Sequence, residues 1–266
     1  MKRMIDAHCH VYPDAIAERA VKGIGSFYDL PLVYRGTLSD LIRVHDAAGI
    51  TNGVIFSVAT TPHQVGSINR FIAEAAEKSC GRFVGLGTLH PDSDTLEGDV
   101  ESILTLGLRG VKLHPDFQKF KMDDPKCFKI FELCEGRLPV LAHTGDHRYD
   151  FSNPRRVARV LSAFPDLTLI GPHFGGWSVW DEAEELLVEY PNFYVDTSSS
   201  LYAMTPERAR RLLRKYGAHR VLFATDYPMW QIDRELARMD ALALTEEEKT
   251  LIFSENAARI FGFSTF

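Results

Sequence analysis

Apolar and polar residues along the chain follow two alternating patterns, one typical of buried strands and one typical of amphipathic helices. Short apolar runs predict eight strands, at residues 4–8, 53–58, 82–89, 108–113, 138–142, 167–172, 192–195 and 220–224. Apolar residues at helical spacing predict helices at 14–22, 39–48, 64–79, 96–106, 125–135, 154–164, 179–189, 206–216, 231–241 and 246–261. The segment 23–36 shows neither pattern, and we expect an irregular connection there.

This order of elements predicts an α/β fold with a parallel sheet covered by helices. Eight strand–helix units in 266 residues fit a single (β/α)8 (TIM) barrel domain over residues 1–266 better than an open doubly wound sheet. No Gly-x-Gly-x-x-Gly motif follows a strand, which disfavours a dinucleotide-binding fold. The long first connection, at 23–37, is the natural candidate for a lid insertion or for an oligomer contact such as that of a homodimer.

Composition narrows the class of protein further. A net charge of −6 gives no reason to expect nucleic acid or an anionic membrane as a partner. No apolar run approaches the roughly 20 residues of a membrane helix, and Asp6 and His8 interrupt the place of a signal-peptide core. The 4 cysteines show no C-x-x-C spacing and fit reduced thiols. We therefore expect a cytoplasmic enzyme acting on a small molecule.

Histidines gather at the predicted strand ends. His8 and His10 end the first strand, where a period of two places them and Asp6 on one face and turns Cys9 away. Alone, a His-x-His pair is weak, since roughly 0.4 are expected by chance with 10 histidines in 266 residues. Later strand ends supply further ligand-type side chains: His90, His114, His143, His173 and Asp226.

In a barrel of this kind the active site lies at the carboxyl ends of the strands, so these side chains should converge. Neutral imidazoles and a carboxylate suit Zn²⁺ or a similar divalent ion, with Mn or Fe as further candidates. An open coordination position would hold a water whose pKa falls towards about 7.

Six segments together resemble the amidohydrolase superfamily, in the amidohydrolase-related branch that contains aminocarboxymuconate-semialdehyde decarboxylase. They are IDAHCH (5–10), GVKLHP (110–115), LAHT (141–144), PHFGG (172–176), LFATDYP (222–228) and NAARIFG (256–262). The resemblance implies metal ligands His8, His10 and His143, with Asp226 as ligand or general base. It also implies that His173 contacts the metal-bound water or polarises the substrate.

Three further residues are candidates for substrate binding. Lys112 and His114 share a face of their strand, and Arg148 could hold a substrate carboxylate by a bidentate pair. Some amidohydrolases bridge two metals with a carbamylated lysine at the position of Lys112, whereas this branch implies one metal, so a single ion is the expectation. Trp177, Trp180, Tyr227 and Trp230 could wall the site, with ordinary loop packing as the alternative for each.

Two reactions remain open. The first is hydrolysis of a small amide, lactone or carboxylate ester by a metal-activated water, with Asp226 transferring the proton. The second is non-oxidative decarboxylation of an unsaturated or aromatic carboxylic acid. A metal-free lyase with Lys112 as a Schiff-base amine is a third hypothesis, and a non-catalytic binding barrel is a fourth.

Overall fold

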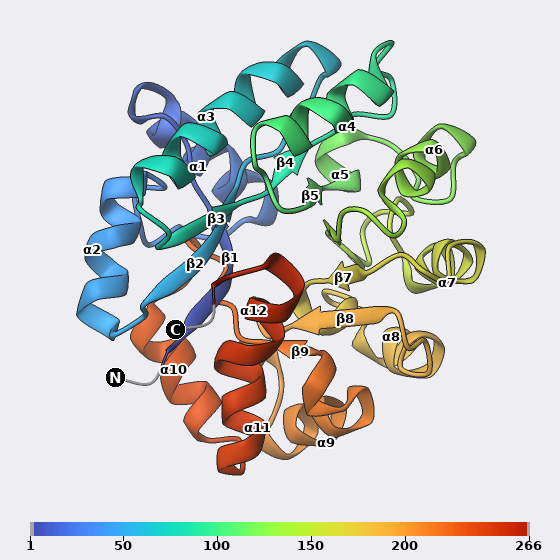
Figure 1. The fold of residues 1–266 in the computed structure, drawn as a ribbon. Helices are drawn as coiled ribbons and strands as arrows, with labels where there is room; N and C mark the ends of the chain where they lie inside the picture. Colours follow the sequence, from blue (N-terminus) through green and yellow to red (C-terminus); the bar gives the residue numbers. More distant parts are fainter. Residues whose placement is uncertain (1–2, 265–266) are drawn as a thin grey trace.

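The computed structural model describes residues 3–264, and its strands form a closed barrel surrounded by helices (Figure 1). The strands are β1 (Ile5–His10), β2 (Asn52–Phe56), β3 (Phe83–Gly85), β4 (Gly87–Thr88), β5 (Val111–Leu113), β6 (Val140–Ala142), β7 (Leu169–Gly171), β8 (Phe193–Asp196) and β9 (Val221–Leu222). Every paired neighbour is parallel. The predicted (β/α)8 barrel is confirmed.

Backbone hydrogen bonds close the ring at two places where the regular ladder is interrupted. β3 and β4 are two halves of one barrel strand, broken at Leu86, whose N–H donates to the carbonyl of Ile55. The second place is the seam between the first and last strands. There the N–H of Ala7 donates to the carbonyl oxygen of Phe223, and the N–H of His10 donates to the carbonyl oxygen of Tyr227. The first and last strands are therefore joined, which leaves eight barrel strands and no free sheet edge within residues 3–264.

The predicted helices are confirmed, with small shifts at most of their ends, and one short helix, α5, was not predicted. The helices are α1 (Asp14–Tyr28), α2 (Leu38–Ala48), α3 (Val65–Lys78), α4 (Leu96–Thr105), α5 (Pro115–Gln118), α6 (Pro125–Cys134), α7 (Pro154–Ala163), α8 (Trp180–Leu187), α9 (Pro206–Tyr216), α10 (Ile232–Asp240), α11 (Glu246–Thr250) and α12 (Asn256–Phe261). A wider π-type turn, Leu251–Glu255, joins α11 to α12 inside the predicted helix 246–261. Gly49 ends α2 at a φ of 73°, a left-handed conformation that glycine adopts without steric cost.

The expectation of an irregular segment from residue 23 is wrong in its first part, because α1 continues to Tyr28. Gly25 explains why the chain can then turn back tightly. A Cβ at this position would lie 2.8 Å from the carbonyl oxygen of Leu30, so only glycine allows the close return. The extended helix carries Ile24 and Tyr28, one turn apart, to the mouth of the barrel.

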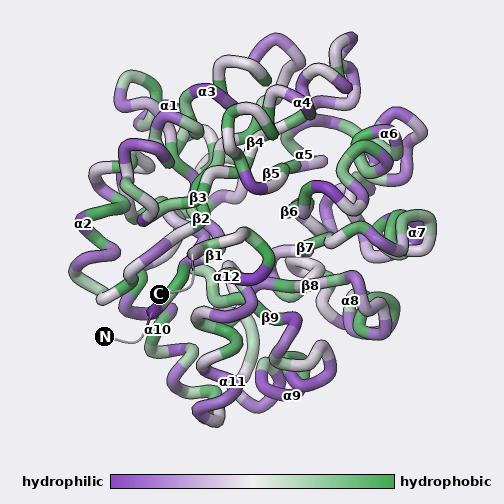
Figure 2. The backbone as a smooth tube through the Cα atoms, in the orientation of Figure 1, coloured by the Kyte–Doolittle hydropathy of each residue, from purple (hydrophilic) through white to green (hydrophobic). Residues whose placement is uncertain are grey.

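The apolar residues form two clusters that account for the layering. A small cluster fills the barrel interior, with Ile5, Ala7 and Leu141 packed against the closing helix α12 through Phe261. The larger cluster lies between the strands and the ring of helices. Figure 2 shows apolar residues concentrated on the central strands, and apolar and polar residues alternating along the surrounding helices.

The expectation that Asp6 shares a face with His8 and His10 is wrong. The pairing of β1 with β2 shifts register between Asp6 and Cys9, which interrupts the alternation of side chains along β1. Asp6 therefore does not point to the same side of the strand as His8 and His10. The Asp6 carboxylate accepts hydrogen bonds from Thr225 and lies 3.2 Å from Nε2 of His45, on α2. Cys9 packs in the outer cluster, away from the two histidines, as predicted.

None of the helices within residues 3–264 combines the length and apolar character that crossing a membrane requires.

Candidate active site

A cavity opens at the carboxyl ends of the barrel strands. It is lined by His8, His10, Ile24, Tyr28, Leu30, Lys112, His114, Phe117, His143, His173, Trp177, Ser199, Asp226, Pro228, Met229 and Trp230. Seven of the residues that were singled out near the strand ends thus line this one cavity: His8, His10, Lys112, His114, His143, His173 and Asp226. His90 is an exception, since its Nδ1 accepts the N–H of Asp92 and it is not among the lining residues.

Three predicted ligands converge at the floor of the cavity. Nε2 of His8 lies 3.2 Å from Nε2 of His10 and 3.3 Å from Oδ1 of Asp226, and Nε2 of His10 lies 3.5 Å from the same oxygen. Two ligands bound tetrahedrally at about 2.1 Å are about 3.4 Å apart, so these distances fit three ligands of one ion. We refer to His8, His10 and Asp226 as the ligand triad.

A neighbouring carboxylate, which was not among the predicted site residues, fixes the tautomer of His8. Asp196, at the end of β8, accepts a 2.8 Å hydrogen bond from Nδ1 of His8. Nε2 of His8 consequently carries a lone pair directed at the triad, the arrangement usual for a metal-ligating histidine. Burial alone would raise the pKa of Asp196, but the charge of His8 and its hydrogen bond outweigh burial and lower that pKa to about 2.

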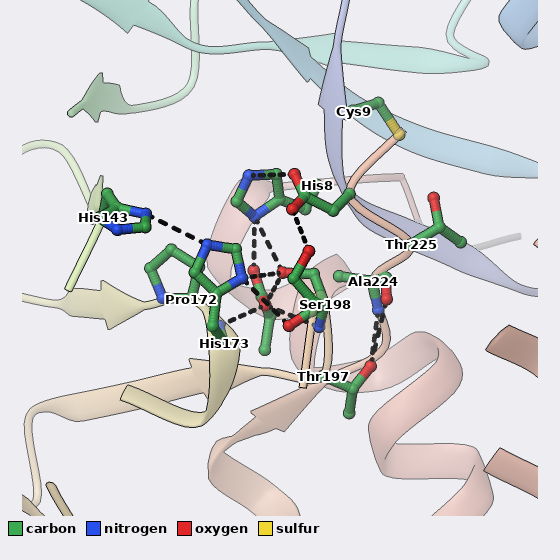
Figure 3. A network of polar contacts seen from close by, with 12 residues as sticks. His8, Cys9, His143, Pro172, His173, Thr197, Ser198, Ala224 and Thr225 are labelled. Carbon is green, nitrogen blue, oxygen red and sulfur yellow. Dashed lines mark hydrogen bonds and ion pairs between the residues drawn. The ribbon is translucent and has the colours of Figure 1, made fainter. Parts of the chain in front are cut away.

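Asp196 is itself held by the chain around it, and Figure 3 shows His8, His173 and Ser198, which belong to this network of polar contacts. Its Oδ1 accepts the N–H of His173 and the N–H and hydroxyl of Ser198. A signal for this residue was present, because Asp196 is an acidic side chain at a strand end, where the other candidates were found.

The carboxylate of Asp226 is fixed on its far side as well. Its Oδ2 accepts from the Ser199 hydroxyl, which in turn accepts a 2.7 Å hydrogen bond from the indole N–H of Trp230. Burial would raise the pKa of Asp226, but the histidine charges, that of His8 foremost, hold it well below its usual value. Asp226 is therefore ionised at neutral pH.

The structure does not bring His143 into the ligand triad. Its Nδ1 lies 3.2 Å from Nε2 of His173, and its Nε2 lies 3.5 Å from Oδ2 of Asp116. Nδ1 of His173 lies 3.0 Å from the carbonyl oxygen of Ser198. Both histidines thus line the cavity beside the triad, in contact with each other.

Burial governs the charge state of the other cavity imidazoles. It lowers the pKa of His10 and His173 to about 4 and that of His114 and His143 well below the usual value. These side chains are consequently neutral near pH 7, with lone pairs available for a metal or for a substrate proton.

Lys112 is fully buried on β5 and lies at the cavity floor, as its alternation with His114 predicts. Its Nζ is 3.3 Å from Nε2 of His8 and 4.8 Å from the centre of the Phe56 ring. Burial lowers the pKa of Lys112 to about 7. A substantial neutral fraction is therefore present at physiological pH.

Aromatic side chains form the walls and roof of the cavity: Tyr28, Phe117, Trp177 and Trp230. Tyr28 reaches in from α1, and its hydroxyl lies 3.0 Å from Nε2 of His114. Trp180 and Tyr227 are elsewhere. The indole of Trp180 donates to the carbonyl of His173, and the Tyr227 hydroxyl donates to Thr37 and Asp40.

Arg148 is not among the lining residues, and its guanidinium is engaged within the protein. Nε and Nη2 donate to the two oxygens of Asp146 at 2.9 and 2.7 Å, and Nη1 donates to the carbonyl of Phe27 at 2.8 Å. The group also lies about 5 Å from the rings of Tyr28 and Trp177. Arg148 thus ties the end of α1 to the loop after β6, and the structure does not support the expected contact with a substrate carboxylate.

Comparison with curated proteins finds a short local similarity. A segment of 72 residues is 35% identical to 2-amino-3-carboxymuconate-6-semialdehyde decarboxylase from Dictyostelium discoideum. The match covers 26% of this chain and 20% of that protein, so the chain matches only about a fifth of its relative's length.

Solved structures share the fold over almost the whole chain. The 5-carboxyvanillate decarboxylase of Sphingomonas paucimobilis has a TM-score of 0.78, with 17% identity over 99% of this chain and 100% of that one. A candidate 2-pyrone-4,6-dicarboxylic acid hydrolase of Pseudomonas putida has a TM-score of 0.70, with 21% identity and full coverage of both chains. A dihydroxybenzoic acid decarboxylase of a Polaromonas species, with bound manganese, has a TM-score of 0.73 and 18% identity over 98% of this chain and 97% of that one.

The family model described as amidohydrolase matches residues 5–263, nearly the full chain. That span contains the ligand triad, Lys112 and every other predicted site residue. The chain belongs to the amidohydrolase family and is an enzyme of this metal-dependent superfamily.

Proposed function

We propose that the protein is a metal-dependent hydrolase of a small, planar substrate with an ester, lactone or amide carbonyl. The observation that carries this proposal is the ligand triad, in which an ionised Asp226 stands beside two imidazole lone pairs at the floor of an aromatic-walled cavity. The carboxylate and the imidazole lone pairs at the cavity floor can accept a proton from an attacking water. Few groups there can donate a proton, because the imidazoles of His10 and His173 are neutral near pH 7.

His8, His10 and Asp226 would hold one divalent ion, for which zinc is the first candidate and manganese or iron the alternatives. The donor set fits, since His8 is locked with its Nε2 lone pair towards the triad and two acceptor groups lie 3.3 Å apart there. When bound, the ion would supply positive charge that polarises the substrate carbonyl and activates water.

The residues of the chain perform the remaining steps. Asp226 accepts a proton from the attacking water and returns it to the leaving group. The Ser199 hydroxyl holds the other carboxylate oxygen, which keeps the accepting oxygen directed at the cavity floor. His173 faces the reacting carbonyl, and the protonated fraction of Lys112 adds positive charge close to Nε2 of His8.

The aromatic walls would select the shape of the substrate. Tyr28 and Trp177, whose ring centres are 5.1 Å apart, and Trp230, which also lines the cavity, favour a flat ring over a branched aliphatic chain. His114 and Tyr28 together place a polar pair at the upper wall, suited to a hydroxyl or carbonyl substituent. The segment 23–37 acts as a lid on the single barrel domain.

Non-oxidative decarboxylation of an unsaturated or aromatic acid is the second candidate. The same aromatic cavity favours it, because transfer of a carboxylate into an apolar enclosure destabilises its charge and promotes loss of CO2. The short match to a decarboxylase and two of the three structural comparisons also lean this way.

The test uses metal-restored protein against a panel of lactones, amides, esters and unsaturated or aromatic acids in ¹⁸O-labelled water. Label in the organic product establishes hydrolysis. Release of CO2 with no label in the organic product establishes decarboxylation. Asp226→Asn should lose either activity by at least about 100-fold, whereas Asp233→Asn, an exposed control on α10, should retain it. An unchanged Asp226→Asn variant would overturn the assignment.

The metal assignment has its own test. His8→Ala and His10→Ala should each lose the ion of the triad by elemental analysis, because each removes one of three protein ligands. Retention of wild-type metal content in both variants would refute the triad. Borohydride trapping of a substrate adduct at Lys112 would instead favour a Schiff-base lyase.

A further inference from the structure

Asp6 is a buried carboxylate that lies two residues before His8 and outside the set of residues that line the cavity. Its exposed fraction is 0%, as are those of its neighbours Thr225 and His45. The N–H groups of His8 and Thr225 donate to Oδ1 at 3.2 and 2.9 Å. The Thr225 hydroxyl donates to Oδ2, and Nε2 of His45 lies 3.2 Å from the same oxygen. A carboxylate has about four lone-pair positions, so these four groups satisfy it fully, as the burial of a charge requires.

The two N–H groups on Oδ1 come from the two strands that meet at the seam of the barrel. His8 lies on β1 and belongs to the ligand triad, whereas Thr225 follows β9 and directly precedes Asp226. Thr225 and Asp6 are 219 residues apart in the chain. One oxygen of Asp6 therefore holds the backbone beside a histidine of the triad and also the backbone beside its carboxylate.

The backbone of Asp226 depends on such support. Its φ is 58°, in the left-handed region that residues other than glycine seldom adopt. A conformation of this kind persists only where the surrounding structure holds it. On one side, the N–H of Thr225 is held by the Asp6 carboxylate. On the other side, the carbonyl oxygen of Tyr227 accepts the N–H of His10 at 2.8 Å. Both flanks of Asp226 are thus fixed by β1.

His45, on α2, supports Asp6 from outside the barrel. A carboxylate oxygen can only accept hydrogen bonds, so the 3.2 Å contact directs an N–H of the His45 ring at Oδ2. The ring is itself packed closely, since a Cβ on Gly53 would lie 3.2 Å from its Cε1. With the imidazole and the Thr225 hydroxyl both on Oδ2, the carboxylate has little freedom to rotate away from the two N–H groups on Oδ1.

We propose that Asp6 is a positioning residue of the ligand triad, which touches neither the ion nor the substrate. Through Oδ1 it holds the backbones of His8 and Asp226 across the seam, and so maintains the 3.3 Å separation between Nε2 of His8 and Oδ1 of Asp226. Two ligands of one ion need a separation of about 3.4 Å, so displacement of either backbone weakens the site. The inference rests on the proposed role of the triad in metal binding.

Three substitutions separate positioning from a general effect on stability. Asp6→Asn keeps an oxygen for the two N–H groups, and its NH2 group can donate to the Thr225 hydroxyl. Asp6→Ala leaves both N–H groups without that acceptor. Asn256→Ala is the matched structural control, because Asn256 is buried and holds the opposite end of β9. Its Nδ2 donates at 2.7 Å to the carbonyl oxygens of Ala218 and Val221.

Metal affinity is the first measurement. Chelator-treated protein is titrated with Mn²⁺ against a competing chelator of known affinity. Asp6→Ala should bind Mn²⁺ about 10- to 100-fold more weakly than wild type, the usual effect of losing a group that orients a metal ligand. Asp6→Asn should stay within a few-fold of wild type, and Asn256→Ala should keep wild-type affinity although its Tm falls. Wild-type affinity in Asp6→Ala, or an equal loss in Asn256→Ala, would overturn the inference.

Amide hydrogen exchange in metal-free protein tests the hydrogen bonds themselves. The N–H groups of His8 and Thr225 should exchange at least about 10-fold faster in Asp6→Ala than in wild type, and they should remain protected in Asp6→Asn. Unchanged exchange of both groups in Asp6→Ala would show that the carboxylate does not hold them, and the inference would fail.

Two variants of Thr225 decide the matter if Asp6→Ala does not fold. Thr225→Val removes the hydroxyl that donates to Oδ2 and should lower Mn²⁺ affinity several-fold, whereas Thr225→Ser retains a hydroxyl and should not. Equal affinities of these two variants would overturn the inference alone. Wild-type protein that binds no Mn²⁺ would overturn the proposed role of the triad as well, so the two failures are distinguishable.

Discussion

Asp196→Asn tests whether the carboxylate behind His8 controls both stability and metal binding. Oδ1 of Asp196 accepts three hydrogen bonds, so an asparagine would keep its oxygen there and turn its NH2 group towards His8. Nδ1 of His8 now donates to Oδ2, and two donors would meet after the substitution. We expect His8 to respond by moving its proton to Nε2, which removes the lone pair directed at the triad.

The magnitude follows from the charge of Asp196. Its pKa falls from 3.8 to about 2, which corresponds to about 2 kcal/mol of stability in a fully buried group. Because the folded-state pKa is the lower one, this contribution is complete above pH 4 and is lost as the pH falls through about 2. The metal-free variant should therefore unfold about 4–8 °C below wild type at pH 7, with the same deficit at pH 5.

Two measurements check this reasoning. Thermal unfolding of chelator-treated protein at pH 7 and pH 5 gives the stability term, with Asp233→Asn as the matched exposed control. Competition with a chelator gives the metal affinity of the triad, which should fall about 10- to 100-fold. Wild-type stability together with wild-type affinity in Asp196→Asn would refute the role assigned to this carboxylate, and a deficit that disappears by pH 5 would point to a different group.

Three further predictions concern the frame around the site. Gly145→Ala should destabilise the fold by at least about 2 kcal/mol in urea titration, because φ is 97° and a Cβ would lie 2.6 Å from the carbonyl carbon of Gly176; a stable variant would mean that the loop shifts freely. Arg148→Lys cannot keep both hydrogen bonds to Asp146, so the end of α1 should be held less firmly. Trypsin should then cut segment 22–35 several-fold faster than in wild type, and equal rates would contradict the role of Arg148 in holding α1. Among the cysteines of the described chain only Cys80 is exposed, so a thiol reagent should titrate one group in native protein and four after unfolding, and a faster-reacting second thiol would contradict the packing.

The fold was predictable because its signals are local and repeated. Apolar strands and amphipathic helices recur eight times, and the rule that active sites lie at strand ends then selected the cavity residues. The expectation of an irregular segment after residue 22 failed, because the sequence there lacks a clear helical pattern although the helix continues to Tyr28, whose ring lines the cavity. Tertiary packing outweighed local propensity there.

The finer arrangement of the site depends on contacts that spacing cannot reveal. His8 and Asp196 are 188 residues apart, and their hydrogen bond follows from the position of β8 in the ring. The facing of Asp6 depends on one register shift in β1, which reverses the side of every later residue. The turn of the His143 ring towards Asp116 depends on which way a single side chain rotates, for which the sequence carries no signal.

The seam between the first and last strands has a consequence for how the site comes into being. His8 and His10 lie on one side of this seam and Asp226 on the other, beside the backbone bond from His10 to Tyr227. The triad therefore brings together residues that are separated by nearly the whole chain. Closing so long a loop costs a large conformational entropy. An ion bound by the triad would therefore hold the first and last strands together, and metal uptake during refolding would report the moment at which the barrel closes.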